Sequence, residues 1–144
     1  MSLLANLKSM LSGGVHKLSG RKDALEAVCA GAALVASADG NISPVEIAAT
    51  LRAIGANPHL SKAFPASEIE RTAEAMLKRA EGGRVGQSGL LAEIKQIAAD
   101  PEISELVLLA TVDVAEADGS IGEKERAVLA TISKALGIPL PAGV

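Results

Sequence analysis

Hydrophobic residues recur along most of the chain at the spacing of one helix face. Residues 1–12 place Leu and Met at helical intervals until two glycines interrupt the pattern. Residues 23–38 are apolar or small at nearly every position, which predicts a helix buried on all sides. Turn and cap residues bound the other periodic stretches. We predict further helices at about 44–54, 67–81, 90–99, 102–117 and 123–136, with one helical turn near 59–62.

Glycines and capping residues mark where several of these helices are expected to begin and end. Ser67 is the expected N-cap of one helix, with Glu70 as its capping-box partner. Four glycines in residues 82–89 predict a flexible connector and a candidate hinge between two helical halves. Asp100 is expected to cap the helix that follows it, and Gly137 to end the last helix.

Composition favours an all-α fold with an aliphatic core. Hydrophobic residues make up 49% of the 144 residues and aromatic residues only 1%, with Phe64 as the single ring. Such a composition suits helices, because strands prefer β-branched and aromatic side chains. The length fits one domain. We expect an N-terminal amphipathic arm at 1–22, one helical domain at 23–138 and a C-terminal tail at 139–144.

Charge and cysteine content limit where the protein is expected to act. The net charge of −3 divides into +4 for residues 1–22 and −7 for the rest. An acidic body without aromatic stacking platforms argues against nucleic acid as a partner. The longest uncharged run, residues 27–38, is shorter than the roughly 18–20 apolar residues of a membrane-spanning helix. Because Cys29 has no disulfide partner and no secretory signal is evident, we expect a cytoplasmic protein.

One nine-residue phrase, A-D-G-x-I-x-x-x-E, occurs twice at an offset of 79 positions. It reads A-D-G-N-I-S-P-V-E at residues 38–46 and A-D-G-S-I-G-E-K-E at residues 117–125. Each copy lies between two predicted helices. The phrase therefore has two interpretations, one structural and one chemical.

The structural interpretation needs no ligand. In the first copy, Gly40 is suited to end the preceding helix, while Ser43 and Glu46 stand at the two positions of a capping box. Two isoleucines flank this cap at the positions of a hydrophobic staple. The second copy fits less well, because Gly122 replaces the serine and Arg126 replaces the second isoleucine.

The chemical interpretation starts from the EF-hand, whose calcium loop ends in the same D-G-x-I-x-x-x-E pattern. A complete EF-hand is rejected, because its first ligand position falls on Val35 and Val114, and valine cannot coordinate a cation. What remains is a pair of acidic half-sites with oxygen ligands, which suit calcium, magnesium or manganese. If the two loops face each other, they would form one shared acidic pocket. The candidate metal ligands are Asp39, Glu46, Asp118 and Glu125, with Glu116 and Glu123 as additional acids.

The residues do not indicate a catalytic centre. His16 and His59 lie far apart in the sequence with no nucleophile pattern nearby, so we expect them to be solvated. Cys29 lies in the most apolar predicted helix, where a thiol behaves as a small inert hydrophobe. We therefore expect a protein that is not an enzyme.

The order of helices around the two phrases resembles the tellurite-resistance TerB family over about residues 23–138. This resemblance implies an all-α, TerB-like domain of about seven helices with a rough internal duplication. It also implies a cytoplasmic bacterial protein linked to tellurite or other chemical stress, which binds divalent metal through acidic residues and acts with membrane-associated partners. The family's acidic positions correspond to Asp39, Glu46, Asp118 and Glu125. One departure is that Ser43–Val45 stand where many members have additional acids.

Two functional hypotheses follow from these observations. The first is a non-enzymatic stress-response module that binds a divalent cation or partner proteins through an acidic surface around both loops. The alternative is a metal-free structural adaptor or co-chaperone-type interaction domain, in which the same residues only cap helices. In either case we expect a protein partner, and the arm at 1–22 is expected to pack on the domain or to meet the inner face of the membrane.

Overall fold

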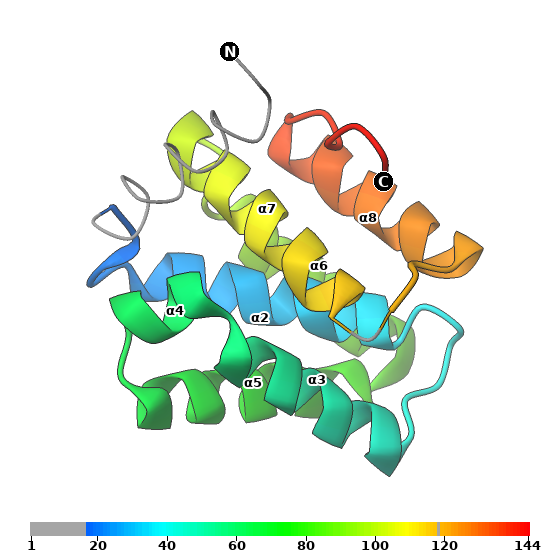
Figure 1. Ribbon diagram of the computed structural model, residues 1–144. Coiled ribbons are helices and arrows are strands. Elements are labelled where there is room, and N and C mark those ends of the chain that lie inside the picture. Colours follow the sequence, from blue (N-terminus) through cyan, green and yellow to red (C-terminus); the bar gives the residue numbers. More distant parts are fainter. Residues whose placement is uncertain (1–16, 118) are drawn as a thin grey trace.

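A computed structural model describes residues 17–117 and 119–144 of the chain (Figure 1). In these residues the protein forms seven helices and no strand, which confirms the predicted all-α class. The helix predicted within residues 1–12 lies outside the described part. The helices are α2 (Lys22–Ala36), α3 (Pro44–Ala56), α4 (Pro58–Ala63), α5 (Ala66–Ala80), α6 (Gly83–Lys95), α7 (Pro101–Glu116) and α8 (Glu123–Leu136).

Helix α2 is the centre of the fold. It packs against α3, α5, α6, α7 and α8, and Figure 1 shows it between α3 and α5 on one side and α7 and α8 on the other. Ten of its fifteen residues are buried, as the sequence predicted for a helix that is apolar on all sides. The other helices therefore contribute one apolar face each to a core built around α2.

Small side chains on α2 let its neighbours approach closely. A Cβ atom added to Gly31 would lie 2.9 Å from both Cγ2 and Oγ1 of Thr111, on α7. The Thr111 hydroxyl donates a hydrogen bond of 2.7 Å to the carbonyl of Val107 within its own helix, so this buried polar group is satisfied. The crossing of α2 and α7 therefore has no room for a larger residue at position 31.

The prediction of a flexible connector at residues 82–89 is wrong, because α6 begins at Gly83 and includes most of that segment. Its glycines serve close packing. A Cβ atom at Gly86 would lie 1.9 Å from the carbonyl oxygen of Arg79, on the preceding helix, and one at Gly89 would lie 2.9 Å from the Arg79 guanidinium. Arg79 also donates a 3.0 Å hydrogen bond to Glu93 on α6. Helix contacts therefore outweigh the low helix propensity of glycine here.

The predicted helix ends are correct in some places and wrong in others. Ser67 is not an N-cap, because α5 begins at Ala66 after Pro65 and has no side-chain cap. Asp100 does cap α7, since its carboxylate accepts a hydrogen bond from the amide of Ile103 at 3.2 Å. Gly137 ends α8 in the left-handed conformation, with φ of 69°.

Ion pairs hold the first described residues against the beginning of α7. Lys17 forms an ion pair with Glu102, and Arg21 pairs with both Asp23 at 3.0 Å and Asp100 at 3.4 Å. The hydrogen bond from Arg21 lowers the pKa of Asp23 below its ordinary value. Leu18, which follows Lys17 in the sequence, is buried. Residues 17–21 thus belong to the packed domain.

The glycine contacts between α5 and α6 predict opposite effects for two matched substitutions. Gly86→Ala should lower the free energy of unfolding by about 1–3 kcal/mol, because its Cβ atom meets a backbone oxygen that cannot move aside. Gly55→Ala should instead raise that free energy by about 0.5–1 kcal/mol, because position 55 is helical and has open space around it. Urea unfolding of both variants measures these effects. Equal effects would show that packing does not distinguish the two glycines.

Candidate functional site

The glycines of the two copies of the repeated phrase have similar backbone geometry. Gly40 and Gly119 have positive φ angles of 96° and 120°, which glycine adopts without the strain of a Cβ atom. The amide of each donates a hydrogen bond to a carbonyl three residues earlier, at Ser37 (3.0 Å) and at Glu116 (2.9 Å). The backbone therefore repeats at the same offset as the sequence.

Gly40 does not end α2, contrary to the sequence prediction. Helix α2 already ends at Ala36, with Ser37 as its C-cap residue. The Ser37 hydroxyl donates a 2.9 Å hydrogen bond to the carbonyl of Ala33, so a side chain supports this end of the helix. Gly40 instead turns the connecting loop toward α3.

Capping hydrogen bonds begin the next helix in each copy, but the second copy has half of the arrangement. In the first, the Ser43 hydroxyl accepts from the amide of Glu46 at 3.2 Å, and the Glu46 carboxylate accepts from the amide of Ser43 at 3.1 Å. This confirms the predicted capping box. In the second, the Glu125 carboxylate accepts from the amide of Gly122 at 3.0 Å. Glycine has no side chain to complete the pair.

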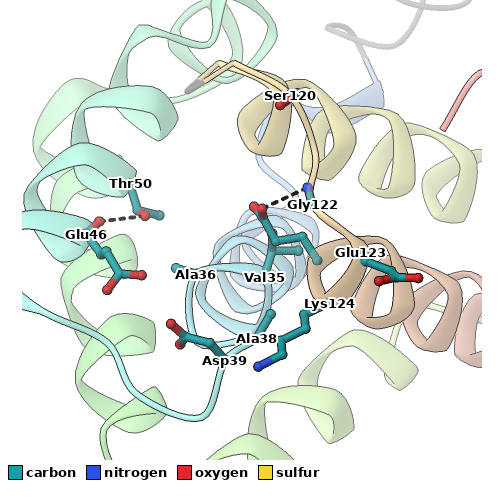
Figure 2. Close-up of a pocket in the computed structure, with 11 residues that line it drawn as sticks. Val35, Ala36, Ala38, Asp39, Glu46, Thr50, Ser120, Gly122, Glu123 and Lys124 are labelled. Carbon is teal, nitrogen blue, oxygen red and sulfur yellow. Dashed lines mark hydrogen bonds between the residues drawn. The ribbon is translucent and has the colours of Figure 1, made fainter.

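The two loops line one pocket of about 630 Å³ at the end of α2 (Figure 2). Carboxylates reach it from both copies of the phrase, and one basic side chain, Lys124, stands among the described lining residues. The fold therefore brings together segments that are 79 positions apart in the sequence. The acidic residues of this lining are Asp39, Glu46, Glu123 and Glu125.

Most of these carboxylates also support the local backbone. Glu46 and Glu125 each use one oxygen in a cap, and the Asp39 carboxylate accepts a 3.2 Å hydrogen bond from the amide of Asn41. Figure 2 shows Asp39 and Glu46 on one side of the pocket and Glu123 on the side of α8. Within residues 17–117 and 119–144, no three acidic, histidine or cysteine side chains are grouped closely enough to hold a metal ion. The acids surround the pocket without converging on one point.

The structure places the predicted site residues unequally. Asp39, Glu46, Glu123 and Glu125 line the pocket, whereas Glu116 is exposed at the end of α7 and does not. Asp118 lies outside the described residues, so its place in the site stays a prediction.

Sequence reasoning did not identify Lys124 or Thr50 as residues of the pocket. Lys124 occupies a variable position of the repeated phrase, which carries no signal of its own. Thr50 lies one helical turn beyond Glu46, and its hydroxyl donates a 2.8 Å hydrogen bond to the Glu46 carbonyl. Helical spacing from Glu46 was the one signal that pointed to it.

Two titratable groups with shifted pKa values lie outside this pocket. Burial raises the pKa of the Cys29 thiol to about 12, so the thiol stays protonated at neutral pH and is a poor nucleophile. Partial desolvation raises the pKa of Asp113, whose side chain is otherwise exposed, and the charge of His59 partly opposes this effect. Neither group lines the pocket between the loops.

Two matched helix–loop–helix units, one of which contains the central helix α2, place an acid-lined pocket between their loops. They define a small all-α domain with internal repetition. The family model described as "Tellurite resistance protein TerB" matches residues 25–141. The chain therefore belongs to the TerB family, which confirms the resemblance noted in the sequence. Comparison with curated proteins and with solved structures gave no significant match.

Membership of this family makes the chain a tellurite-resistance-like domain, and domains of this kind are generally not enzymes. Across the described ranges, every helix is too short or too polar to cross a membrane.

The capping geometry predicts that Ser43→Ala destabilises the protein. The amide of Glu46 would lose its hydrogen-bond acceptor, so the free energy of unfolding should fall by about 1 kcal/mol. Ser67→Ala is the matched control, because Ser67 is exposed and lies inside the first turn of α5, and its effect should stay within about 0.5 kcal/mol. Chemical denaturation of both variants compares them. A larger loss from Ser67→Ala would contradict the assignment of the two caps.

Proposed function

We propose that this protein is a non-enzymatic stress-response module that binds a divalent cation, partner proteins or both at the acidic pocket between its loops. One observation carries the proposal: acids from both copies of the phrase line the same pocket. Glu123 also lines the pocket, as an acid in the first turn of α8 that makes no capping hydrogen bond among the described contacts. A pocket with this charge attracts a cation or a basic surface.

The donor chemistry of the pocket fits a hard cation. Its acids offer carboxylate oxygens, which suit calcium, magnesium or manganese better than zinc. Asp39, Glu46 and Glu125 are the residues that would hold the ion, together with Asp118 by its match to the repeated phrase. Glu46 and Glu125 each retain a second oxygen beyond the one used in the cap. Affinity should be modest, with a Kd of roughly 10⁻⁴–10⁻³ M, because the described acids do not converge on a point.

A bound cation would supply positive charge between two acidic loops and so join the α2–α3 unit to the α7–α8 unit. The repulsion between carboxylates of the two loops would fall, and the native state would gain stability by mass action. The surface around the pocket would then be presented to a partner in one arrangement. This is binding chemistry and requires no reaction.

The metal-free adaptor is the second candidate, and particular contacts favour it. Glu46 and Glu125 already have structural roles as caps, and Lys124 supplies a positive charge inside the pocket. Val45, beside Glu46, is 76% exposed, which is unusual for a large apolar side chain. In this alternative the pocket rim contacts a partner that has both basic and apolar groups.

Thermal unfolding with and without cation separates the two functions. At roughly 10 mM calcium, magnesium or manganese, the wild type should gain about 1.4–2.7 kcal/mol over the chelated protein if the proposed affinity holds. Asp39→Asn/Asp118→Asn should lose this gain. Glu46→Gln/Glu125→Gln should lose it too while keeping both caps, because glutamine also accepts the amide hydrogen bonds. No gain in the wild type, or equal gains in all three proteins, would favour the adaptor.

Lys124 provides an independent test of cation binding. Its ammonium group lies in the same pocket and opposes a bound cation, so Lys124→Gln should strengthen cation binding by about threefold to tenfold. Arg126→Gln is the control, because it removes the same charge from an exposed position that does not line the pocket. Isothermal titration with calcium or manganese measures both. Equal changes in the two variants would show that net charge, and not the pocket, governs binding.

A further inference from the structure

A second concave surface of the protein is apolar and lies apart from the acidic pocket. It is a groove of about 370 Å³ between α6 and α8, with Leu34 of α2 at its floor. Leu91, Val128 and Ile132 supply most of its apolar wall. Val85, at the beginning of α6, is 84% exposed nearby in the sequence. An apolar groove between two helices is a shape that accepts the apolar face of a third helix.

We propose that residues 3–11 of this same chain dock in the groove as an amphipathic helix. Leu3, Leu7 and Met10 fall on one helical stripe, together with Leu4 and Leu11. Ser9 falls on the opposite side of that helix, and the single charge, Lys8, falls about 100° from Leu7. The stripe would place aliphatic side chains against an aliphatic wall. The proposal is independent of what binds the acidic pocket.

The length of chain before Lys17 matches the distance that the arm must cover. Position 17 is held at the beginning of α7 by its ion pair with Glu102. Leu34, in the groove, lies 12 residues beyond Lys22, the first residue of α2, which is about 18 Å along that helix. Five extended residues before position 17 span about 17 Å, and a helix over residues 3–11 adds about 13 Å. An arm that runs over the surface of α6 and α8 is therefore long enough to bring Leu7 to the groove.

The path of this arm follows the direction of the neighbouring helices. Arg84, at the start of α6, lines the groove with Leu34, whereas Asp100, just beyond the end of α6, pairs with Arg21 at the start of α2. Helices α2 and α6 therefore run antiparallel. An arm that starts from position 17, at the end where α6 stops, would therefore reach the groove by running toward the start of α6.

Another apolar hollow, between α3, α4 and α5, fits the arm less well. It measures about 310 Å³ and is lined by Leu51 and Ile69 together with the charged side chains of Arg52 and Glu70. A leucine-rich stripe placed there would cover two charges without offering either a partner. The groove beside α6 contains one charged residue, Arg84, at its far end. This difference favours the α6–α8 groove.

Engineered disulfides in the full-length chain test the docking. In a Cys29→Ala background, Leu7→Cys/Ser88→Cys should form an intramolecular disulfide rapidly under mild oxidation, because Ser88 lines the groove and a disulfide needs Cβ atoms within about 3.5–4.5 Å. Ser9→Cys/Ser88→Cys places the thiol on the opposite side of the arm and should react at least tenfold more slowly. Leu7→Cys/Arg52→Cys, directed at the other hollow, should be equally slow. Mass spectrometry under non-reducing conditions identifies each product.

Three results would overturn the proposal. Equal rates for all three pairs would show an arm without a fixed place. Faster reaction with position 52 would place the arm at the other hollow, and a disulfide between two chains would make a second copy the occupant. Where the Cys29→Ala background fails to fold, Leu4→Asp/Leu7→Asp and Asn6→Asp/Ser9→Asp replace the disulfides. The first pair should increase binding of an apolar fluorescent dye severalfold and the second should not, and equal dye binding would also overturn the proposal.

Discussion

The close crossing of α2 and α7 is the constraint on which the rest of the structure depends. Gly31 and Thr111 meet there without space for another methyl group. Each lies five residues before the end of its helix, at Ala36 and at Glu116. Both helices therefore extend about 7.5 Å beyond the crossing before their loops begin. The two loops are neighbours because the two helices cross at the same distance from their C-terminal ends.

This arrangement also explains why the pocket is lined by several acids whose carboxylates do not meet at one point. Each loop is built locally, by a glycine with positive φ and by a glutamate that accepts hydrogen bonds from the backbone. Packing between the two units, with the crossing of α2 and α7 as its tightest point, relates one loop to the other. Side chains that have local roles are less able to move to a common centre, so the pocket surrounds a ligand more loosely than a single continuous loop such as an EF-hand would. Packing between distant helices brings the acids of the two loops to the same pocket. Their local hydrogen bonds limit how closely the carboxylates can approach one another.

Much of the fold was predictable from the sequence, because helix ends are governed by neighbouring residues. Asp100 and the Ser43–Glu46 pair cap helices as their spacing indicated. The largest error, the connector predicted at residues 82–89, arose where tertiary contacts outweigh local preference. Gly86 reads as a helix breaker, yet it is the residue that lets α6 approach Arg79.

In the candidate site, it was mainly the residues that both copies of the phrase share that could be predicted from the sequence. The repeated phrase indicated Asp39, Glu46 and Glu125, and all three line the pocket. Lys124 stands at a position that the two copies do not share, so no pattern marked it. That the loops face each other depends on a crossing between helices far apart in the sequence, which neither loop encodes.

The two helices that begin at the pocket, α3 and α8, differ in how firmly their first turns are capped. Ser43 and Glu46 each accept a hydrogen bond from the other's amide. At α8, the Glu125 carboxylate accepts from the amide of Gly122, but Gly122 has no side chain to accept from the amide of Glu125. The first turn of α8 therefore opens at lower free energy than the first turn of α3. If a ligand binds in the pocket, the α3 side already has both of its capping hydrogen bonds. Local adjustment to that ligand is then expected at the first turn of α8, where glycine replaces serine at the cap.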